Sequence, residues 1–300
     1  MANPSDILVQ LSSALVARAA DARGAIAAVR LGGGRHLTGT IWGPGLVVAS
    51  EQSLPKRDRF ELVLPGGGGA EAALAGRDAG TNIALLRPLQ PVAPPPAQPG
   101  QADLGSLALA FGADGAGGAT ARMGLVNLVG PEWHSRAGGR IDARIVLDLR
   151  LAPAEEGGPV FDGAGGRLGI TTFGPRGRVL VIPARTIEAV IPLLLQHGRV
   201  ARGWLGLAFQ RVAVPDALQP QAGQASALMV VSVAAGGPAA KAGVMPGDIV
   251  LAVDGAATTR LHGIVPRLGP DSIGHSVDLR LLRGGALATL QAVIEARPAA

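Results

Sequence analysis

The stretch PAEEGGPVFDGAGGRLGITTFGP, residues 153–175, predicts a tight turn followed by a β-hairpin. A Gly-Gly-Pro turn leads into an apolar strand, a glycine-rich turn and a second apolar strand. Two glutamates, Glu155 and Glu156, stand directly before the Gly-Gly-Pro turn. Neighbouring side chains on a loop normally point apart and face water, so the pair alone predicts neither a metal site nor acid–base chemistry.

The composition favours many short strands over long helices. Hydrophobic residues make up 48% of the 300 residues but aromatic residues only 3%, so the core must be built from Ala, Val, Leu and Ile. The 45 glycines and 23 prolines favour frequent turns. Because the chain has no cysteine, disulfides, thiol catalysis and thiolate metal sites are excluded.

The net charge of +5 does not indicate a nucleic-acid partner. The charge comes almost wholly from arginines scattered singly along the chain, since Lys56 and Lys241 are the only lysines. There is neither a basic run nor a basic stretch interleaved with aromatic residues. No histidine or acidic pattern has metal-ligand spacing, so we expect no metal and no cofactor.

The opening residues predict an amphipathic helix over residues 3–20 rather than a targeting segment. No basic region comes first, and Asp6 interrupts the opening. No stretch of the chain approaches the 18 apolar residues of a membrane span. We therefore expect a cytoplasmic chain, or a periplasmic one if the true start lies upstream of Met1. Within residues 3–20, the apolar residues recur at helical spacing: Ile7, Leu8, Leu11, Leu15 and Val16.

Two breaks divide the chain into three parts. The proline-rich segment RPLQPVAPPPAQPGQ (87–101) can form neither a helix nor a central strand, and we expect it to join two halves of one unit. The second break lies near LLLQHGRVARG (193–203), after a short apolar helix. Short strands at regular spacing fill the space between these breaks, which is typical of a barrel or sandwich. We predict three parts: an N-terminal helix (1–22), a mostly β unit (23–198) and a separate unit (199–300).

Three segments resemble the HtrA/DegP family of serine proteases, in the same order and at suitable separations. They are TGTIWGPGLVVASEQSL (38–54), RDAGTNIALLRP (77–88) and AEEGGPVFDGAGGRLGITT (154–172). The resemblance runs from about residue 25 to the end of the chain. It implies a mainly β fold, with a chymotrypsin-like double β-barrel followed by a PDZ domain.

The same resemblance places the catalytic triad on residues that cannot perform its chemistry. The general-base histidine falls on Gln52, the orienting aspartate on Asn82 and the nucleophilic serine on Glu156. A serine hydroxyl needs a histidine to remove its proton and a buried carboxylate to orient that histidine. The resemblance therefore implies a catalytically inactive member. The five histidines of the chain fall at none of these positions: His36, His134, His197, His262 and His275.

In active relatives the turn at Gly157 and Gly158 belongs to the loop whose backbone N–H groups form an oxyanion hole. A carboxylate beside such converging donors could occupy them itself. One hypothesis is that Glu156 fills this former anion pocket and stabilises the loop. The alternative is that the loop has collapsed and Glu156 faces water.

The last third of the chain resembles the bacterial-type PDZ domain, in RGWLGLAFQ (202–210) and SVAAGGPAAKAGVMPGDIVLAVDG (232–255). The glycine of the first segment allows backbone N–H groups to converge on the terminal carboxylate of a peptide. The strand over residues 207–212 would then pair with the extended peptide. The resemblance assigns the carboxylate loop to four residues: Trp204, Leu205, Gly206 and Leu207.

The segment TTRLHGIVPRLG (258–269) is expected to form the helix along the peptide groove, shortened and broken by Gly263 and Pro266. It would contribute His262 and Val265 to the groove.

Together these features predict an HtrA-like pseudoprotease that acts as a peptide-binding or scaffold module through its PDZ domain. Its partners would be protein C-termini or unfolded polypeptide segments, unless the PDZ domain serves assembly alone. Two alternatives are a protease with residual or altered activity and a holdase-like chaperone for unfolded chains. The resemblance also implies a homotrimer, to which the helix over residues 3–20 could contribute, or that helix could simply pack on the barrel.

Overall fold

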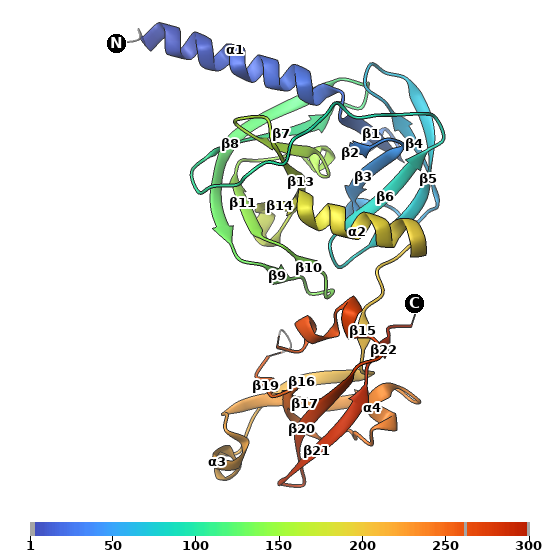
Figure 1. The fold of residues 1–300 in the computed structure, drawn as a ribbon, viewed down its shortest axis with the longest axis vertical. Helices are drawn as coiled ribbons and strands as arrows, with labels where there is room; N and C mark the ends of the chain where they lie inside the picture. The colour runs from blue at the N-terminus through green and yellow to red at the C-terminus, as the bar shows by residue number, and fades with distance from the viewer. Residues whose placement is uncertain (1–3, 261–262, 299–300) are drawn as a thin grey trace. The chain divides into compact units, whose positions relative to one another are not determined.

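The structure is a computed structural model that describes residues 4–260 and 263–298 and divides into two compact units. The first unit comprises the chain up to Trp133 together with residues 141–200. The second comprises residues 134–140 and the chain from Ala201 onward. Strands dominate both units (Figure 1). Within the two described ranges, no helix is both long and apolar enough to cross a membrane.

The first unit contains two closed β-barrels, with the strand orders β1-β2-β3-β6-β5-β4 and β11-β14-β13-β12-β7-β8. Glycine-rich turns join the neighbouring strands into hairpins. The strands of the first barrel are β1 (Ile26–Gly32), β2 (Arg35–Gly43), β3 (Leu46–Ser50), β4 (Arg59–Val63), β5 (Gly69–Asp78) and β6 (Ile83–Pro88). Those of the second are β7 (Leu107–Ala113), β8 (Ala119–Gly130), β11 (Arg144–Asp148), β12 (Pro159–Asp162), β13 (Arg167–Phe173) and β14 (Val179–Pro183).

The proline-rich segment joins the two barrels. It runs from the end of β6 to β7 without a regular element, because proline lacks the N–H that a sheet ladder needs. Three 3₁₀ turns and a short ribbon complete the connections. These are η1 (Glu51–Ser53), η2 (Pro153–Glu155), η3 (Pro175–Gly177), β9 (Trp133–His134) and β10 (Arg140–Ile141).

Aliphatic side chains fill both barrels, as the composition requires. Val29, Val47 and Leu62 are fully buried in the first barrel, and Val126 and Val160 in the second. Burying each such side chain contributes about 1.5–3 kcal/mol, so these interiors dominate the stability of the unit.

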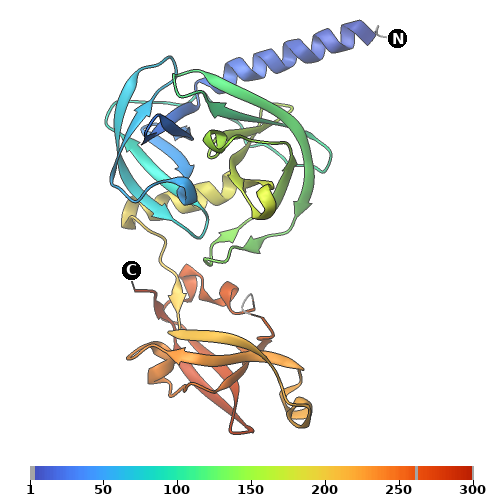
Figure 2. The ribbon, with the colours of Figure 1, turned by 180° about the vertical axis from the view of Figure 1, so that it is seen from behind.

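A further apolar cluster joins the two barrels under helix α2 (Ala184–His197). The helix packs on β5 and β6 of the first barrel and on β13 and β14 of the second. Figure 1 shows α2 in front of both barrels, and Figure 2 shows it behind them. Gly198 ends the helix at φ +70°, a conformation that glycine adopts without strain. The buried face of α2 consists of Thr186, Ile187, Val190 and Leu194.

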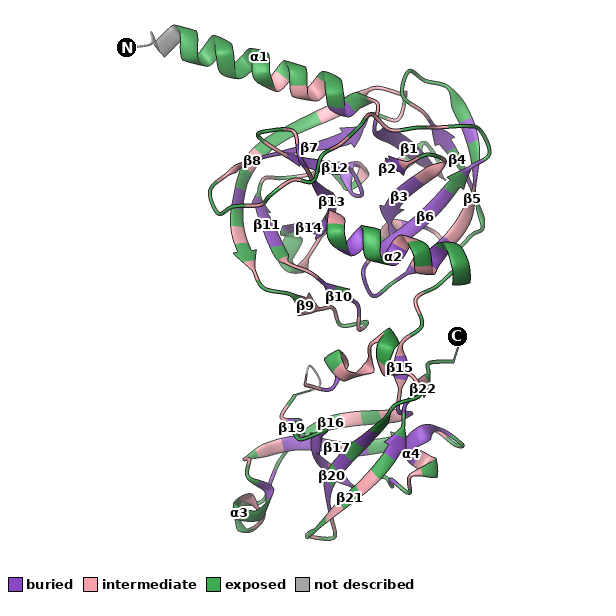
Figure 3. Ribbon diagram, viewed as in Figure 1, coloured by how far each residue is buried: buried purple, intermediate pink, exposed green. Residues whose placement is uncertain are grey.

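Helix α1 (Pro4–Arg23) extends away from the barrels (Figure 1). Near its C-terminal end, Leu15, Ala19 and Ala22 pack on a cluster that includes Phe161. Its preceding turns are exposed (Figure 3), so only part of the predicted apolar face is covered within the unit. Five of its larger apolar side chains are 40–67% exposed: Ile7, Leu8, Val9, Leu11 and Val16.

The second unit is built on one antiparallel sheet with the strand order β16-β17-β18-β20-β21. Its strands are β15 (Gly203–Trp204), β16 (Leu207–Ala213), β17 (Ser226–Val233), β18 (Ile249–Val253), β19 (Ala256–Ala257), β20 (Ser276–Arg283), β21 (Ala286–Val293) and β22 (Glu295–Ala296). Its short helices are η4 (Asp216–Leu218), α3 (Gln219–Ala222), α4 (Pro238–Lys241), η6 (Val265–Leu268) and η7 (Pro270–Ser272).

The helix expected over residues 258–269, shortened and broken by Gly263 and Pro266, is 3₁₀ in its described part. Gly263 and η6 have 3₁₀ geometry. Pro266 has no N–H to donate, which disfavours a longer α-helical run. His262 lies outside the described residues.

An ion pair between the buried Asp248 and the partly exposed Arg283 fixes the turn before β18. Arg283 donates from Nε and Nη2 to the two oxygens of Asp248, at 2.8 and 2.7 Å. The N–H of Met245 donates to the same carboxylate at 2.8 Å. Burial by itself raises the pKa of Asp248, but these hydrogen bonds outweigh it and hold the pKa below its ordinary value.

We predict that Arg283→Gln lowers the Tm of the second unit most at neutral pH. A depressed carboxyl pKa stabilises the fold above the ordinary value of about 3.9, and this contribution is lost as the pH falls through the folded-state pKa. The difference in Tm between Arg283→Gln and the parent chain should therefore become smaller as the pH is lowered towards 2. Calorimetry between pH 2 and 7 measures it, with the exposed Arg211→Gln as the matched control. A pH-independent difference would contradict the prediction.

Candidate functional site

The three positions assigned to the triad meet between the two barrels. Gln52 lies in η1 directly after β3, Asn82 precedes β6, and Glu156 follows η2. The N–H of Gln52 donates to Oδ1 of Asn82 at 2.7 Å, and Nε2 of Gln52 donates to Oε1 of Glu156. Asn82 adopts φ +59°, which asparagine tolerates better than most residues. The sequence therefore predicted three residues that do form one cluster.

Glu156 is buried, at 2% exposure, and its carboxylate is the acceptor at the centre of this cluster. Ser50 Oγ donates to it at 2.9 Å and the N–H of Phe173 at 3.2 Å. Ser53 Oγ and Nε2 of Gln52 donate as well. The donors come from β3 and η1 on one side and from β13 on the other, so the carboxylate links the two barrels.

Thr172 and Ser50 extend the network to Asn82. Nδ2 of Asn82 donates to the hydroxyls of Ser50 and Thr172, at 2.9 and 2.7 Å. The Thr172 hydroxyl donates its own proton to Glu156 at 3.0 Å. Each hydroxyl thus accepts from an amide and donates to the carboxylate, which satisfies both roles of the group. Sequence reasoning missed Ser50, Ser53 and Thr172, because hydroxyl residues at these places have no distinctive spacing.

Neither hypothesis for Glu156 describes the cluster fully. The side chain does not face water, because it is buried and hydrogen-bonded. It does not occupy the N–H groups of Gly157 and Gly158 either. Gly157 N–H donates to the carbonyl of Thr171 at 3.0 Å, and Gly158 N–H donates to Thr171 Oγ1 at 3.2 Å. Glu156 stabilises the loop through side chains of the two barrels instead.

Two further N–H groups of the loop are also used internally. In η2 the N–H of Glu155 donates to the carbonyl of Ala152 at 2.9 Å, and that of Glu156 donates to the carbonyl of Pro153 at 3.4 Å. An oxyanion hole needs donors aimed at one point outside the loop. The four N–H groups from Glu155 to Gly158 bond within the fold instead.

Packing explains why the Gly-Gly pair persists without that role. A Cβ on Gly157 would lie 2.4 Å from the carbonyl oxygen of Thr38, and a Cβ on Gly158 would lie 1.8 Å from that of Phe111. Gly157 also has φ +87°, where glycine is strongly preferred. Thr40 Oγ1 donates to the carbonyl of Gly157 at 2.8 Å, which holds the turn against β2.

Glu155 points away from Glu156 and is buried as well, at 3% exposure. Thr120 Oγ1 donates to it at 2.7 Å, Arg122 Nε at 3.1 Å, and the N–H of Ala152 at 2.7 Å. Burial by itself raises the pKa of Glu155. These donors and the Arg122 charge lower the pKa by more than burial raises it, so the net shift is downward. The expected divergence of the two glutamates is found, but the expected exposure to water is not.

No candidate base or metal site accompanies the cluster. His36 lies on β2, where its Nε2 contacts the carbonyl of Ala113 at 3.0 Å. Throughout residues 4–260 and 263–298, no three histidine, aspartate or glutamate side chains gather as metal ligands.

The second unit holds an apolar groove beside a strand edge. β16 pairs with β17 and is the terminal strand of the described sheet, so its other edge is open to an added strand. Gly206 precedes β16 at φ +76°. A cavity of about 260 Å³ opens at this place. Its lining includes Trp204, Leu205, Gly206, Leu207, Phe209, Ile264, Val265 and Leu268.

Trp204 shapes the loop in front of this groove. Its ring lies so close that a Cβ on Gly206 or Gly237 would come within 3.2–3.3 Å of it. Leu205 is buried in the core, at 3% exposure, while Leu207 is only partly covered. Of the predicted groove residues, the structure brings together Trp204, Leu205, Gly206, Leu207 and Val265.

Comparison with known proteins agrees with this architecture. Residues 37–170 match the family described as trypsin-like peptidase domain, and residues 203–294 match the PDZ domain. Relatives named "Probable periplasmic serine endoprotease DegP-like" include those of Brucella suis (28% identical over 264 residues) and Rhizobium meliloti (27% over 263). Each alignment covers 85% of this chain but only 51% and 52% of the relative, so the chain spans about half the length of these relatives.

Solved structures share the fold over nearly the whole chain. The structure titled "HtrA-type protease AlgWS227A with tripeptide" is 26% identical, with a TM-score of 0.71 and coverage of 94% of this chain and 96% of that one. The serine endoprotease from Yersinia pestis is 23% identical, with a TM-score of 0.72 and coverage of 94% and 97%. The predicted mainly β fold, a chymotrypsin-like double barrel followed by a PDZ domain, is confirmed. The chain is therefore similar to proteins of the HtrA/DegP type, with a domain of trypsin-like peptidase fold followed by a C-terminal PDZ domain.

Proposed function

We propose that this chain is a catalytically inactive HtrA-type protein that binds peptides or protein C-termini through its PDZ domain. The observation that supports inactivity best is the hydrogen-bonded cluster of Gln52, Asn82 and Glu156. In that cluster the buried carboxylate accepts from Ser50, Thr172 and the N–H of Phe173, and no histidine among the described residues is present there to remove a proton from a nucleophile.

The chemistry of the replaced residues leads to the same conclusion. The Gln52 amide is not a base at neutral pH, and it already donates to Glu156. A carboxylate that attacked a peptide carbonyl would form an anhydride, with no base to activate water for its hydrolysis. The N–H groups of residues 155–158 bond within the fold, so they are not aimed at the charge of a tetrahedral intermediate.

Peptide binding is supported by the groove of the second unit. The open edge of β16 offers backbone hydrogen bonds to an extended peptide, and the apolar cavity offers a place for its last side chain. The turn at Gly206 lets backbone N–H groups lie close to a carboxylate. The similar structures titled "HtrA-type protease AlgW with tripeptide" and "with decapeptide" support peptides as the ligand class.

Assembly and compartment stay predictions. The exposed apolar side chains of α1 offer a surface on which the expected homotrimer could form, and the sedimentation coefficient of the purified chain tests it. The relatives are named periplasmic, whereas the opening residues led us to expect the cytoplasm. Cell fractionation distinguishes the two compartments.

We predict that the purified chain does not degrade casein and is not labelled by a serine-directed phosphonate. The Glu156→Ser variant should behave in the same way, because residue 52 remains a glutamine that cannot activate the new hydroxyl. A gel time course with an active HtrA-type protease as positive control measures both properties. Cleavage by the parent chain that is lost in Glu156→Ala would show that Glu156 performs chemistry and would refute the proposal.

We predict that Glu156→Ala destabilises the first unit by about 3 kcal/mol, since several buried donors lose their acceptor. A Tm decrease of roughly 6–12 °C corresponds to that loss for a unit of this size. Scanning calorimetry measures it, with Glu71→Ala, at an exposed position on β5, as the control that should leave the Tm unchanged. An unaltered Tm for Glu156→Ala would mean that the carboxylate has no structural role.

We predict that Val265→Glu weakens binding of a peptide with an apolar C-terminal residue by at least about tenfold, because it places a second carboxylate beside that of the peptide. Fluorescence anisotropy with labelled decapeptides of varied C-terminal residue measures the affinity. The same substitution at the exposed Val293 on β21 is the matched control. Equal affinity of the two variants, or equal affinity for C-terminally amidated peptides, would argue against this groove as the binding site.

A further inference from the structure

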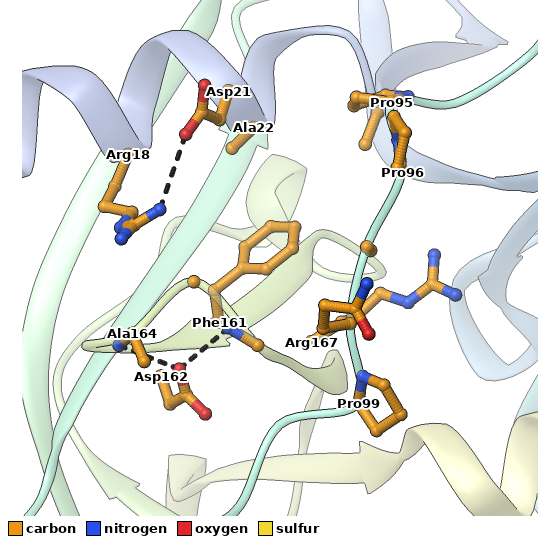
Figure 4. Close-up of a pocket in the computed structure, with 15 residues that line it drawn as sticks. Arg18, Asp21, Ala22, Pro95, Pro96, Pro99, Phe161, Asp162, Ala164 and Arg167 are labelled. Carbon is orange, nitrogen blue, oxygen red and sulfur yellow. Dashed lines mark hydrogen bonds and ion pairs between the residues drawn. The ribbon is translucent and has the colours of Figure 1, made fainter.

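Two cavities of the first unit lie away from the cluster around Glu156, and their lining residues differ in chemistry. The larger, about 650 Å³, lies among α1, the proline-rich segment and the hairpin of β12 and β13 (Figure 4). Its cationic groups are engaged within the chain: Arg18 pairs with Asp21 at 3.6 Å, and Arg167 lies over the ring of Trp42 at 3.7 Å. The smaller, about 370 Å³, is dominated by arginine.

Four arginines line this smaller cavity, which we call the arginine cleft: Arg30, Arg35, Arg57 and Arg59. They are scattered in the sequence, and the first barrel gathers them. The β1–β2 turn brings Arg30 near Arg35, and the pairing of β1 with β4 brings both near Arg59. This explains why no basic run was visible in the sequence.

The carboxylates of the arginine cleft do not neutralise it. Arg30 faces Glu61 and Arg59 faces Glu71, each at 3.9 Å between nitrogen and oxygen. The side chains of these two arginines and two glutamates are 41–83% exposed, so both ion pairs are weak. Arg35 has no ion pair with any described residue, and neither does Arg57. Two positive charges in this cleft therefore have no carboxylate partner among the described residues.

Arg57 is held in place before any ligand binds. Its guanidinium lies over the ring of Phe60, 4.8 Å from the ring centre, and its Nη2 donates to the carbonyl of Arg30. Phe60 is itself buried, at 2% exposure, and so is a rigid support. A preorganised guanidinium loses little conformational entropy when it binds an anion.

The rim of the arginine cleft is free of side chains at one point. Gly32 and Gly34, at φ +94° and +75°, line it in the β1–β2 turn. A Cβ at either position would meet no atom within 4 Å, so this side is open space. A ligand several atoms long can enter there and reach the arginines.

We propose that the arginine cleft binds an anion with clustered phosphate oxygens, of the size of a di- or triphosphate. Guanidinium groups bind phosphate oxygens in pairs, through two parallel hydrogen bonds. Close positive charges repel one another, and a multivalent anion relieves that repulsion where a single carboxylate would not. The ligand is either a free polyphosphate or the phosphate headgroups of a lipid surface.

The test is calorimetric titration of the full chain with sodium tripolyphosphate at low salt, beside flotation with vesicles. One set of vesicles contains phosphatidylglycerol in phosphatidylcholine, and the other contains phosphatidylcholine alone. The variant is Arg35→Ser with Arg57→Ser. Its control is Arg144→Ser with Arg178→Ser, two exposed arginines of the second barrel. Arg57→Lys keeps the charge but loses the paired hydrogen bonds, and it should show intermediate affinity.

We expect saturable binding that weakens at least about tenfold in the cleft variant and not in the control, since hydrogen bonds between charged groups are worth tenfold or more each. Loss of tripolyphosphate binding in the cleft variant supports a free polyphosphate. Loss confined to phosphatidylglycerol vesicles supports a lipid headgroup. Failure of the parent chain to bind either probe, or equal effects in variant and control, overturns the proposal. Neither readout depends on the PDZ domain or on proteolysis.

Discussion

The buried carboxylate of Glu156 is the interaction on which the arrangement of the first unit depends. It accepts hydrogen bonds from β3 and η1 of one barrel and from β13 of the other, so it stands where the two barrels meet. A buried carboxylate is costly unless every acceptor site is used, and here the neighbouring hydroxyl and amide groups supply the donors. In an active relative the same place must stay accessible to a substrate. Here the space is filled by a structural contact.

The loop before Glu156 is held from both sides in a way that suits structure better than catalysis. Thr38 Oγ1 donates to the carbonyl of Ala154 at 2.7 Å, and Thr40 Oγ1 binds that of Gly157, both from the first barrel. From the second barrel, Arg122 and Thr120 bind Glu155. The loop thereby keeps the glycine turn of a peptidase while its N–H groups bond within the fold. The site therefore has the backbone shape of a peptidase turn, but its hydrogen bonds hold the fold together.

The second unit offers an open place for a peptide. β16 has a free edge, and the cavity beside it is lined mainly with aliphatic and aromatic side chains, with Arg136, Arg202 and Arg297 among them. Its wall on the side of Val265 is a 3₁₀ turn instead of the expected helix, so the groove is bordered by a shorter element. Peptide recognition through this groove would need the sheet edge and the Gly206 turn more than that wall.

The sequence by itself determined the fold. Apolar strands at regular spacing and glycine turns predicted a barrel or sandwich, because these patterns are local, and the resemblance of the motifs around Gln52, Asn82 and Glu156 to the HtrA/DegP family implied two barrels and a PDZ domain. They also identified the three residues that meet at the former triad.

Only the tertiary structure decided how those residues behave. The donors of Glu156 lie as far as 123 positions apart along the chain, from Ser50 to Phe173, and no spacing rule connects hydroxyl groups at such separations. The four arginines of the arginine cleft are likewise single residues in the sequence and come together only when β1, β2 and β4 pair. Hydrogen bonds and charges act through space, so their partners are set by the folded sheet and not by the order of residues.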